Sequence, residues 1–294
     1  MKGRKLACCF LFCLPPLRRF STVGFSLRPS SYDIIGDIAL IKTPDMGAPI
    51  RDIGEQVMAS NRKIKVCAVK TAPMEGPFRQ SQVHVIAGED RLETTHKEWG
   101  VKTKVHLGKV FFSVRMSAER KRVCDLVQPK EKILVLFAGC GPQSCMLCKL
   151  TEVSRVVAVE KNPDAIACLK MSRDANKLGP DRLRIVQQDV REFKTLETFD
   201  RILIPRPKGE GSFLDCALPF AEPRGAWIHW YDFSEPGGES GGFVSSRKEV
   251  EDGCMDSGFQ CRVERIVKAS KTSIGKRKYR LCVDAFVWKE DESI

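Results

Sequence analysis

The feature that most constrains this chain is the stretch Lys132–Leu150, KILVLFAGCGPQSCMLCKL. The apolar run Ile133–Phe137 has the length of a buried strand, glycines come directly after it, and the next residues suit a helix. A strand, a glycine turn and a helix start form the first unit of a nucleotide-binding sheet, because glycine lets the backbone approach a ligand closely. Gly139 and Gly141 lack the third glycine of the dinucleotide fingerprint, so the ligand class depends on residues further along the chain.

The downstream sequence alternates between strand and helix patterns. Further strands are expected at Arg155–Glu160, Leu183–Val186, Phe199–Ile204, Ala226–Tyr231, Gln260–Ile266 and Tyr279–Trp288. Helices are expected at Ser144–Leu150, Asn162–Lys177, Ser212–Phe220 and Ser246–Ser257. This order predicts an α/β domain with a doubly wound, Rossmann-like parallel sheet. Its two closing strands suggest the antiparallel end of a methyltransferase-type sheet.

Upstream, residues 32–116 are expected to form a small α+β domain. A hairpin is predicted at Tyr32–Ile41, broken at Gly36, and a helix at Ile50–Asn61. Strands are predicted at Lys65–Lys70 and Gln82–Gly88, with a loop at Ala72–Arg79 between them. A polar stretch at Thr94–Gly100 ends in a turn, and a last hairpin pairs Val101–Val105 with Lys109–Val114. Ser117 is expected to cap a helix that runs to about Val127 and opens the second domain, residues 117–294.

Residues 1–31 form a basic N-terminal extension with six Lys and Arg and no acid. The apolar run Leu6–Leu14 is too short to span a bilayer. An acid-free start with arginines and serines fits a mitochondrial transit peptide. A secretory signal, a disordered basic tail and a wrongly chosen start codon are the alternatives, and cytoplasm or nucleus the alternative compartments.

Charge and cysteine content indicate the partner and the redox environment. The net charge of +12 favours an anionic partner, with nucleic acid the first candidate. The thirteen cysteines are odd in number and mostly lie in apolar runs, which is typical of reduced, buried thiols and argues against secretion. Cys140, Cys145 and Cys148 match part of an iron–sulfur spacing, but core thiols are favoured and no metal is expected.

Polar residues come after successive predicted strands. Gly139 and Gly141 follow the first, Glu160 ends the second, Asp189 follows the third and Pro205-Arg206-Pro207 follows the fourth. Ligands bind at the carboxyl ends of parallel strands, where an acid after the second strand suits a ribose and one after the third an adenine. S-adenosylmethionine is favoured over a dinucleotide because the pyrophosphate fingerprint is missing.

Several linked motifs resemble the tRNA (guanine-N1)-methyltransferases of archaea and eukaryotes, which modify guanine 37 beside the anticodon. The motifs are FFSVRMSAER, VLFAGCGP, VEKNP and IPRPKGEGSFLDCALPFAEPRGAWIHWYDF, with YDIIGDIAL, FRQSQVHVIAG and TTHKEWG upstream and YRLCVDAFV at the end. The resemblance covers about Tyr32–Trp288. It implies a class I methyltransferase fold, S-adenosylmethionine as cofactor, an RNA-binding role for the small domain, and a monomer that binds the tRNA anticodon stem-loop without a membrane.

The resemblance also implies residue roles. Glu119 matches the general base that removes the guanine N1 proton, and Arg79 matches the arginine that stabilises charge on O6. The implied cofactor contacts are Arg120, Phe137, Ala138, Gly139, Gly141, Glu160, Lys161, Asp189, Val190 and Pro205. The expected RNA contacts are Arg115, Arg206, Lys208, Lys276 and Arg277, the last two in the acid-free segment Lys268–Arg280.

The chain departs from the family in three respects. FAGCGPQSC stands where FAGVGPFSI is more usual. Many members carry Asn-Leu-Pro where this chain has Pro205-Arg206-Pro207, so Arg206 is unusual. The family's first domain, which inspects the tRNA elbow, is expected to be absent. Two alternatives therefore stay open: an aminocarboxypropyl transferase of wybutosine synthesis and a non-catalytic RNA-binding relative. The FSxRxxxER pattern, which contains Glu119, favours methyl transfer, because methylation of guanine N1 needs a general base.

Overall fold

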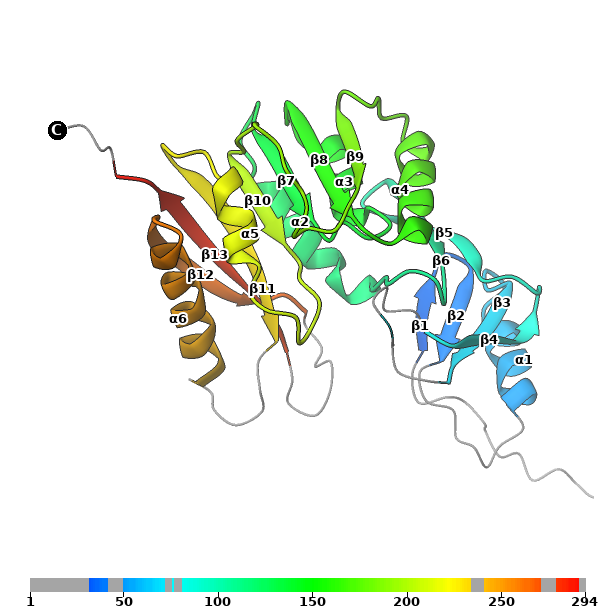
Figure 1. The fold of residues 1–294 in the computed structure, drawn as a ribbon. Coiled ribbons are helices and arrows are strands. Elements are labelled where there is room, and N and C mark those ends of the chain that lie inside the picture. The colour runs from blue at the N-terminus through cyan, green and yellow to red at the C-terminus, as the bar shows by residue number, and fades with distance from the viewer. Residues whose placement is uncertain are drawn as a thin grey trace, which may run out of the picture.

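The computed structural model describes residues 32–41, 50–71, 76, 81–233, 241–270 and 279–290. These residues form a large β-sheet with helices on both faces and a small β-sheet that packs against α1 (Ile50–Ser60), and a hairpin joins the two sheets (Figure 1). Within the described residues, no helix is both long and apolar enough to cross a membrane. The described cysteines are all free, and burial raises the pKa of Cys145 to about 12.

The large sheet has seven strands in the order β12-β13-β11-β10-β7-β8-β9. Its strands are β7 (Lys132–Leu136), β8 (Arg155–Glu160), β9 (Leu183–Gln187), β10 (Arg201–Ile204), β11 (Ala226–Phe233), β12 (Gln260–Lys268) and β13 (Arg280–Trp288). The five strands β7 to β11 pair in parallel, whereas β13 pairs antiparallel with both β11 and β12. The predicted doubly wound sheet with an antiparallel end is confirmed.

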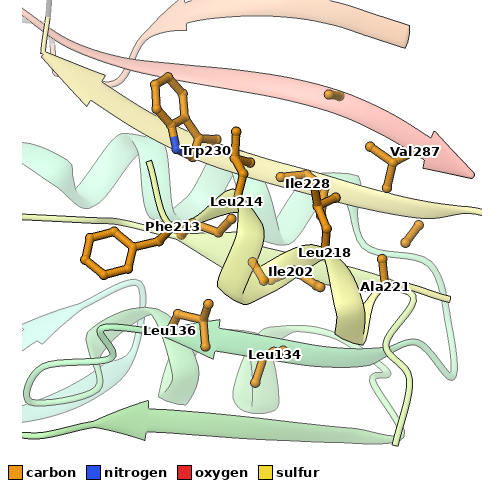
Figure 2. Close-up of a cluster of buried hydrophobic side chains, with 14 of the residues drawn as sticks. Leu134, Leu136, Ile202, Phe213, Leu214, Leu218, Ala221, Ile228, Trp230 and Val287 are labelled. Carbon is orange, nitrogen blue, oxygen red and sulfur yellow. The ribbon is translucent and has the colours of Figure 1, made fainter. Parts of the chain in front are cut away.

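Helices cover both faces of this sheet. On one face lie α2 (Ser117–Leu126), α3 (Pro142–Leu150) and α4 (Pro163–Ala175); on the other lie α5 (Leu214–Ala217), the 3₁₀ turn Leu218–Phe220 and α6 (Gly241–Asp256). Successive residues of β7 point to opposite faces, as strand geometry requires. Leu134 and Leu136 join the cluster beneath α5, together with Trp230 (Figure 2). Ile133 and Val135 pack under α2 and α3.

The small sheet has the order β1-β2-β3-β4 and carries the helix α1 (Ile50–Ser60). Its strands are β1 (Tyr32–Ile35), β2 (Ile38–Ile41), β3 (Val66–Lys70) and β4 (Val83–Gly88). Ile53 and Val57 of α1 are buried against it, as the helical spacing predicted. The expected loop at 72–79 lies outside the described residues apart from Gly76.

The second predicted hairpin, which paired Val101–Val105 with Lys109–Val114, was predicted in the wrong place. β5 (Glu93–Glu98) pairs antiparallel with β6 (Val101–His106) around Trp99 and Gly100, and no strand forms over residues 109–113. Both turn residues have positive φ, 51° and 79°, which suits the turn to a tight hairpin. Two side chains of the polar stretch Thr94–Lys97 tie this strand to the rest of the protein, because Thr94 and His96 accept hydrogen bonds from the backbone of the β1–β2 turn.

The start of α2 also differs from the prediction. Met116 occupies the N-cap position and makes no side-chain capping bond, while Ser117 is already helical. The Ser117 hydroxyl instead accepts a hydrogen bond from the indole Nε1 of Trp99, at 3.1 Å. Ser117 therefore links the hairpin to α2.

The β5–β6 hairpin connects the two sheets. On one side, Ser172 and Asn176 of α4 accept hydrogen bonds from the β6 backbone at Lys104 and Lys102. On the other side, β5 contacts the β1–β2 turn at Gly36 and Asp37. A shared apolar cluster reinforces the junction, with Ile35, Ile38, Val105, Cys140 and Ala165 among its members. The expected domain boundary at residues 116/117 stays a prediction.

Candidate active site

Two adjoining cavities open at the carboxyl ends of the parallel strands, with volumes of 340 and 110 Å³. The larger cavity reaches the loop after β8, and the smaller one reaches the start of α3 and the side of α2. Both are lined by Phe111, Ser113, Met116, Phe137, Gly139, Pro205 and Arg280. This is the edge of a doubly wound sheet at which ligands bind.

The glycine loop and Glu160 form the floor of the cavities. The Glu160 carboxylate accepts backbone N–H bonds from Gly139 and Asn162, both at 2.8 Å, which fixes it against the loop. Gly139 has φ +57°, and a Cβ there would meet only the Phe111 carbonyl oxygen, at 3.9 Å, so it faces open space. Gly141, with φ +80°, instead lies against Leu169, so its lack of a side chain serves packing.

Some of the other expected cofactor residues line the cavities, whereas others lie behind the cavity wall. Lys161 lines the larger cavity and pairs with Asp189, with 3.4 Å between Nζ and Oδ2. A hydrogen bond from the Arg191 backbone N–H, together with Lys161, holds the pKa of Asp189 below its usual value. Val190 is buried in the core, and Ala138 lines the smaller cavity. Asp189 and Val190 are absent from the lining of both cavities.

The loop after β10 forms another wall, in which Arg206 is 7 % exposed. Its Nη2 donates to Asp232 at 2.5 Å, and its guanidinium lies 4.6 Å from the centre of the Trp230 ring. Its Nε has no hydrogen-bond partner among the described residues. Lys208 also lines this cavity, as does Arg115, which pairs with Asp33 of β1 at 3.2 Å.

Arg120 lines the smaller cavity, and its guanidinium is fixed by Glu98, which lies outside the cavity lining. It makes two hydrogen bonds to Glu98 of β5, at 2.5 and 2.8 Å, and its guanidinium lies 5.5 Å from the centre of the Phe112 ring. The hairpin thus positions an arginine at the cofactor edge.

Glu119 lies one layer behind the cavity wall. It is 4 % exposed and lines neither cavity. Arg122 donates to both of its oxygens at 2.8 Å, and the Tyr231 hydroxyl donates to Oε1 at 3.0 Å. Tyr231 itself lines the smaller cavity, so it separates Glu119 from the ligand space.

A buried polar network continues from Arg122 to the far end of the sheet. Arg122 donates to Asp284, Asp284 contacts His229, His229 contacts Arg201, and Arg201 makes two hydrogen bonds to Glu131. Because an arginine can only donate, His229 Nε2 must accept from Arg201 and its Nδ1–H must donate to Asp284.

The pKa values of this network agree with its geometry. Burial lowers the pKa of His229, in agreement with a neutral ring. Burial alone would raise the pKa of Asp284, but the hydrogen bonds from His229 and Arg122 lower it well below its usual value. Asp284, His229 and Cys282 are close enough to hold a metal, but the two flanking arginines already use the oxygen and nitrogen ligand atoms. This trio therefore does not fit a cation.

Three of the predicted contacts, Arg79, Lys276 and Arg277, lie outside the described residues. Cys140 packs in the cluster at the junction of the two sheets, whereas Cys145 and Cys148 lie on α3 and pack against the large sheet, so the thiols are core residues. Sequence reasoning missed Tyr231 and counted Arg280 only as part of the basic segment Lys268–Arg280, without placing it at the cofactor site. Arg280 is 8 % exposed, with its guanidinium 5.4 Å from the centre of the Tyr231 ring and 5.2 Å from that of Phe233. The available signal was an arginine directly before the apolar run Leu281–Val283 of the last strand.

The residues present fit S-adenosylmethionine. Glu160 is fixed where a ribose diol would reach it, Gly139 leaves the space that a close ligand needs, and the smaller cavity extends from there toward Arg120 and Gln143. The strand order and this site define a class I methyltransferase.

Comparison with known proteins identifies the family. Sequence profiles of the TRM5/TYW2 methyltransferase domain and of the TYW2 N-terminal domain match residues 94–257 and 25–91. A tRNA (guanine(37)-N(1))-methyltransferase Trm5b of Pyrococcus abyssi is 32 % identical over 91 % of this chain and 76 % of its own length. The chain belongs to the TRM5/TYW2 methyltransferase family.

Two further relatives bear on the reaction. The structure of a complex of aTrm5 and tRNALeu matches with a TM-score of 0.76 and 29 % identity, covering 88 % of this chain and 72 % of the other. A tRNA(Phe) (4-demethylwyosine(37)-C(7)) aminocarboxypropyltransferase of Methanocaldococcus jannaschii is 29 % identical over 68 % of this chain and 77 % of its own length. The two activities of the family are thus both represented among its relatives.

Proposed function

We propose that this protein is an S-adenosylmethionine-dependent tRNA methyltransferase that methylates N1 of guanine 37. The observation that carries the proposal is the buried Glu119 carboxylate, joined through the Tyr231 hydroxyl to the wall of the strand-end cavity. A site that methylates guanine N1 needs a proton acceptor, because N1 carries a proton and is not nucleophilic while it does. The bound cofactor supplies a methyl group on a positively charged sulfonium.

The chain's own residues supply binding and orientation. Glu160 holds the ribose hydroxyls, Gly139 admits the cofactor, and Arg120 contacts it from the hairpin side. The target base enters where the two cavities adjoin, beside Arg280, which lines both of them, and within reach of Tyr231 in the smaller one. Arg79 stabilises charge on guanine O6.

The tRNA binds through its anticodon stem-loop, and the protein acts as a monomer. The net charge of +12 and the basic residues beside the cavity support the tRNA partner. Light scattering with and without tRNA tests the stoichiometry.

The direct test uses labelled cofactor and a matched pair of tRNAs that carry G or A at position 37. We expect a methyl group on N1 of G37 and none on A37, mapped by mass spectrometry of nuclease fragments. A mass increase corresponding to aminocarboxypropyl would assign the second activity of the family, and cofactor binding with no tRNA product would leave only RNA binding.

Glu119→Gln tests the proton acceptor. The amide keeps a partner for Arg122 but cannot take a proton at neutral pH, so we expect methyl transfer to fall by at least about 10²-fold. Cofactor affinity, measured by calorimetry, is expected to stay within a few-fold. Unchanged turnover would remove Glu119 from the mechanism.

The acid-free composition of residues 1–31 supports a mitochondrial location. Fusing residues 1–31 to a fluorescent protein, beside a fusion in which the six basic residues are replaced by Gln, tests this part of the proposal. Import of the first fusion alone is the expected result, and cytoplasmic or nuclear signal from both would contradict it.

A further inference from the structure

Glu119 has no direct route to the target base in this structure. Its side chain is 3 % exposed, lines neither cavity, and has both oxygens engaged by Arg122 and Tyr231. A general base must lie within hydrogen-bond reach of the proton that it removes, directly or through one intermediary. The group between Glu119 and the cavity is the Tyr231 side chain, which is buried on one side and lines the cavity on the other.

Building on the proposed function, we infer that Tyr231 is a catalytic residue that passes the guanine N1 proton to Glu119. The Tyr231 oxygen takes the proton from N1 while its own proton moves to Glu119 Oε1. Tyr231 ends as a phenol again, Glu119 ends as a neutral acid, and the N1 lone pair forms the bond to the methyl group. The negative charge lost by Glu119 balances the positive charge lost by the methyl donor.

The surroundings of the pair suit this relay. Burial raises the pKa of Tyr231 well above its usual value, so the phenol keeps a proton to donate at neutral pH. Arg122 bridges Glu119 and Asp284, so its charge keeps a partner after Glu119 is neutralised. Met116, which lines both cavities, packs against the apolar cluster of Tyr231, Ala269 and Cys282.

The test is Tyr231→Phe, which removes the hydroxyl and keeps the ring. Single-turnover methylation is expected to fall by about 10²-fold or more, with cofactor and tRNA affinities within a few-fold of wild type. Tyr32→Phe, at a tyrosine of the small sheet, is the matched control and should behave as wild type. The double variant Glu119→Gln/Tyr231→Phe should be no slower than the slower single variant, because both changes break one relay.

A proton inventory separates the relay from a merely structural tyrosine. In mixtures of H₂O and D₂O, two protons moving together give a curved dependence of the wild-type rate on deuterium content, whereas one proton gives a straight line. A straight line overturns the relay even if Tyr231→Phe is slow or poorly folded. A Tyr231→Phe rate near wild type, with Glu119→Gln inactive, also overturns it. In every case wild-type product at N1 of G37 upholds the proposed function independently.

Discussion

At the scale of single residues, Arg206 shows how surroundings decide a role. The sequence placed it in a loop beside the target base, as an RNA contact. In the structure the Arg206 guanidinium donates a hydrogen bond to Asp232 and lies over the Trp230 ring. It therefore shapes the cavity wall, and the phosphate contacts must come from more exposed basic residues.

Arg206→Leu is expected to lower the free energy of unfolding by about 1–3 kcal/mol, because Asp232 loses a charged partner in a half-buried place. Asp232 keeps the Ser246 hydroxyl at 2.6 Å, which limits the loss. The double variant Arg206→Leu/Asp232→Asn should regain part of it in urea titrations. The salt dependence of tRNA binding should keep its slope, and a slope lowered by about one would instead identify Arg206 as a phosphate contact.

At the scale of elements, the sequence was a good guide to the large sheet and a weaker one to the site. The central strands β7 and β8 are buried on both faces, so their continuous apolar runs, and the glycine after β7 and the acid at the end of β8, could be identified locally. The hairpin β5–β6 was misplaced because its polar strand is stabilised by hydrogen bonds to distant segments. Tyr231 was missed because its partner Glu119 lies 112 residues away, and no local pattern marks such a pair.

The antiparallel pair β11–β13 carries the buried histidine, and this predicts a pH dependence of stability. His229 is neutral in the folded protein with a pKa below 6.5, so the unfolded chain binds more protons between that lowered pKa and about pH 6.5. The free energy of unfolding therefore loses nothing to His229 above pH 6.5. Below pH 6.5 it falls with decreasing pH by up to about 1.4 kcal/mol per pH unit. Asp284, whose pKa is also lowered, adds to the loss only below about pH 4.

His229→Gln is the variant that isolates this effect. It is expected to be less stable than wild type at pH 7, since a buried hydrogen-bonded ring is lost, but its stability should change less between pH 5 and 6.5. Urea titrations at several pH values measure both quantities, with His84→Gln on the exposed face of β4 as the control. Parallel profiles for wild type and His229→Gln would contradict a neutral buried His229.

At the scale of the whole molecule, the hairpin sets the position of the small sheet relative to the cofactor cavities. Glu98 of β5 holds Arg120 at the cofactor edge, and the opposite side of the hairpin receives the β1–β2 turn. In that turn Asp37 makes two hydrogen bonds to Arg91, at 2.6 and 3.1 Å, and accepts another from Thr94. If the small domain binds RNA, the contact between the β1–β2 turn and the hairpin aligns the bound RNA with the methyl donor.

Gly36→Ala tests that alignment. Gly36 has φ +59°, and a Cβ there would lie 2.1 Å from Thr94 Oγ1 and 2.8 Å from the Thr95 carbonyl oxygen, so the turn must move away from β5. Gly100→Ala is the matched control, because it has φ +79° with no atom within 4 Å and should incur only the backbone strain of about 1–2 kcal/mol. We expect Gly36→Ala to reduce kcat/KM for tRNA by at least about tenfold, the effect of about 1.4 kcal/mol of lost alignment, while cofactor affinity stays within a few-fold. Equal kcat/KM values for the two variants would show that the small sheet does not need this contact to align the tRNA.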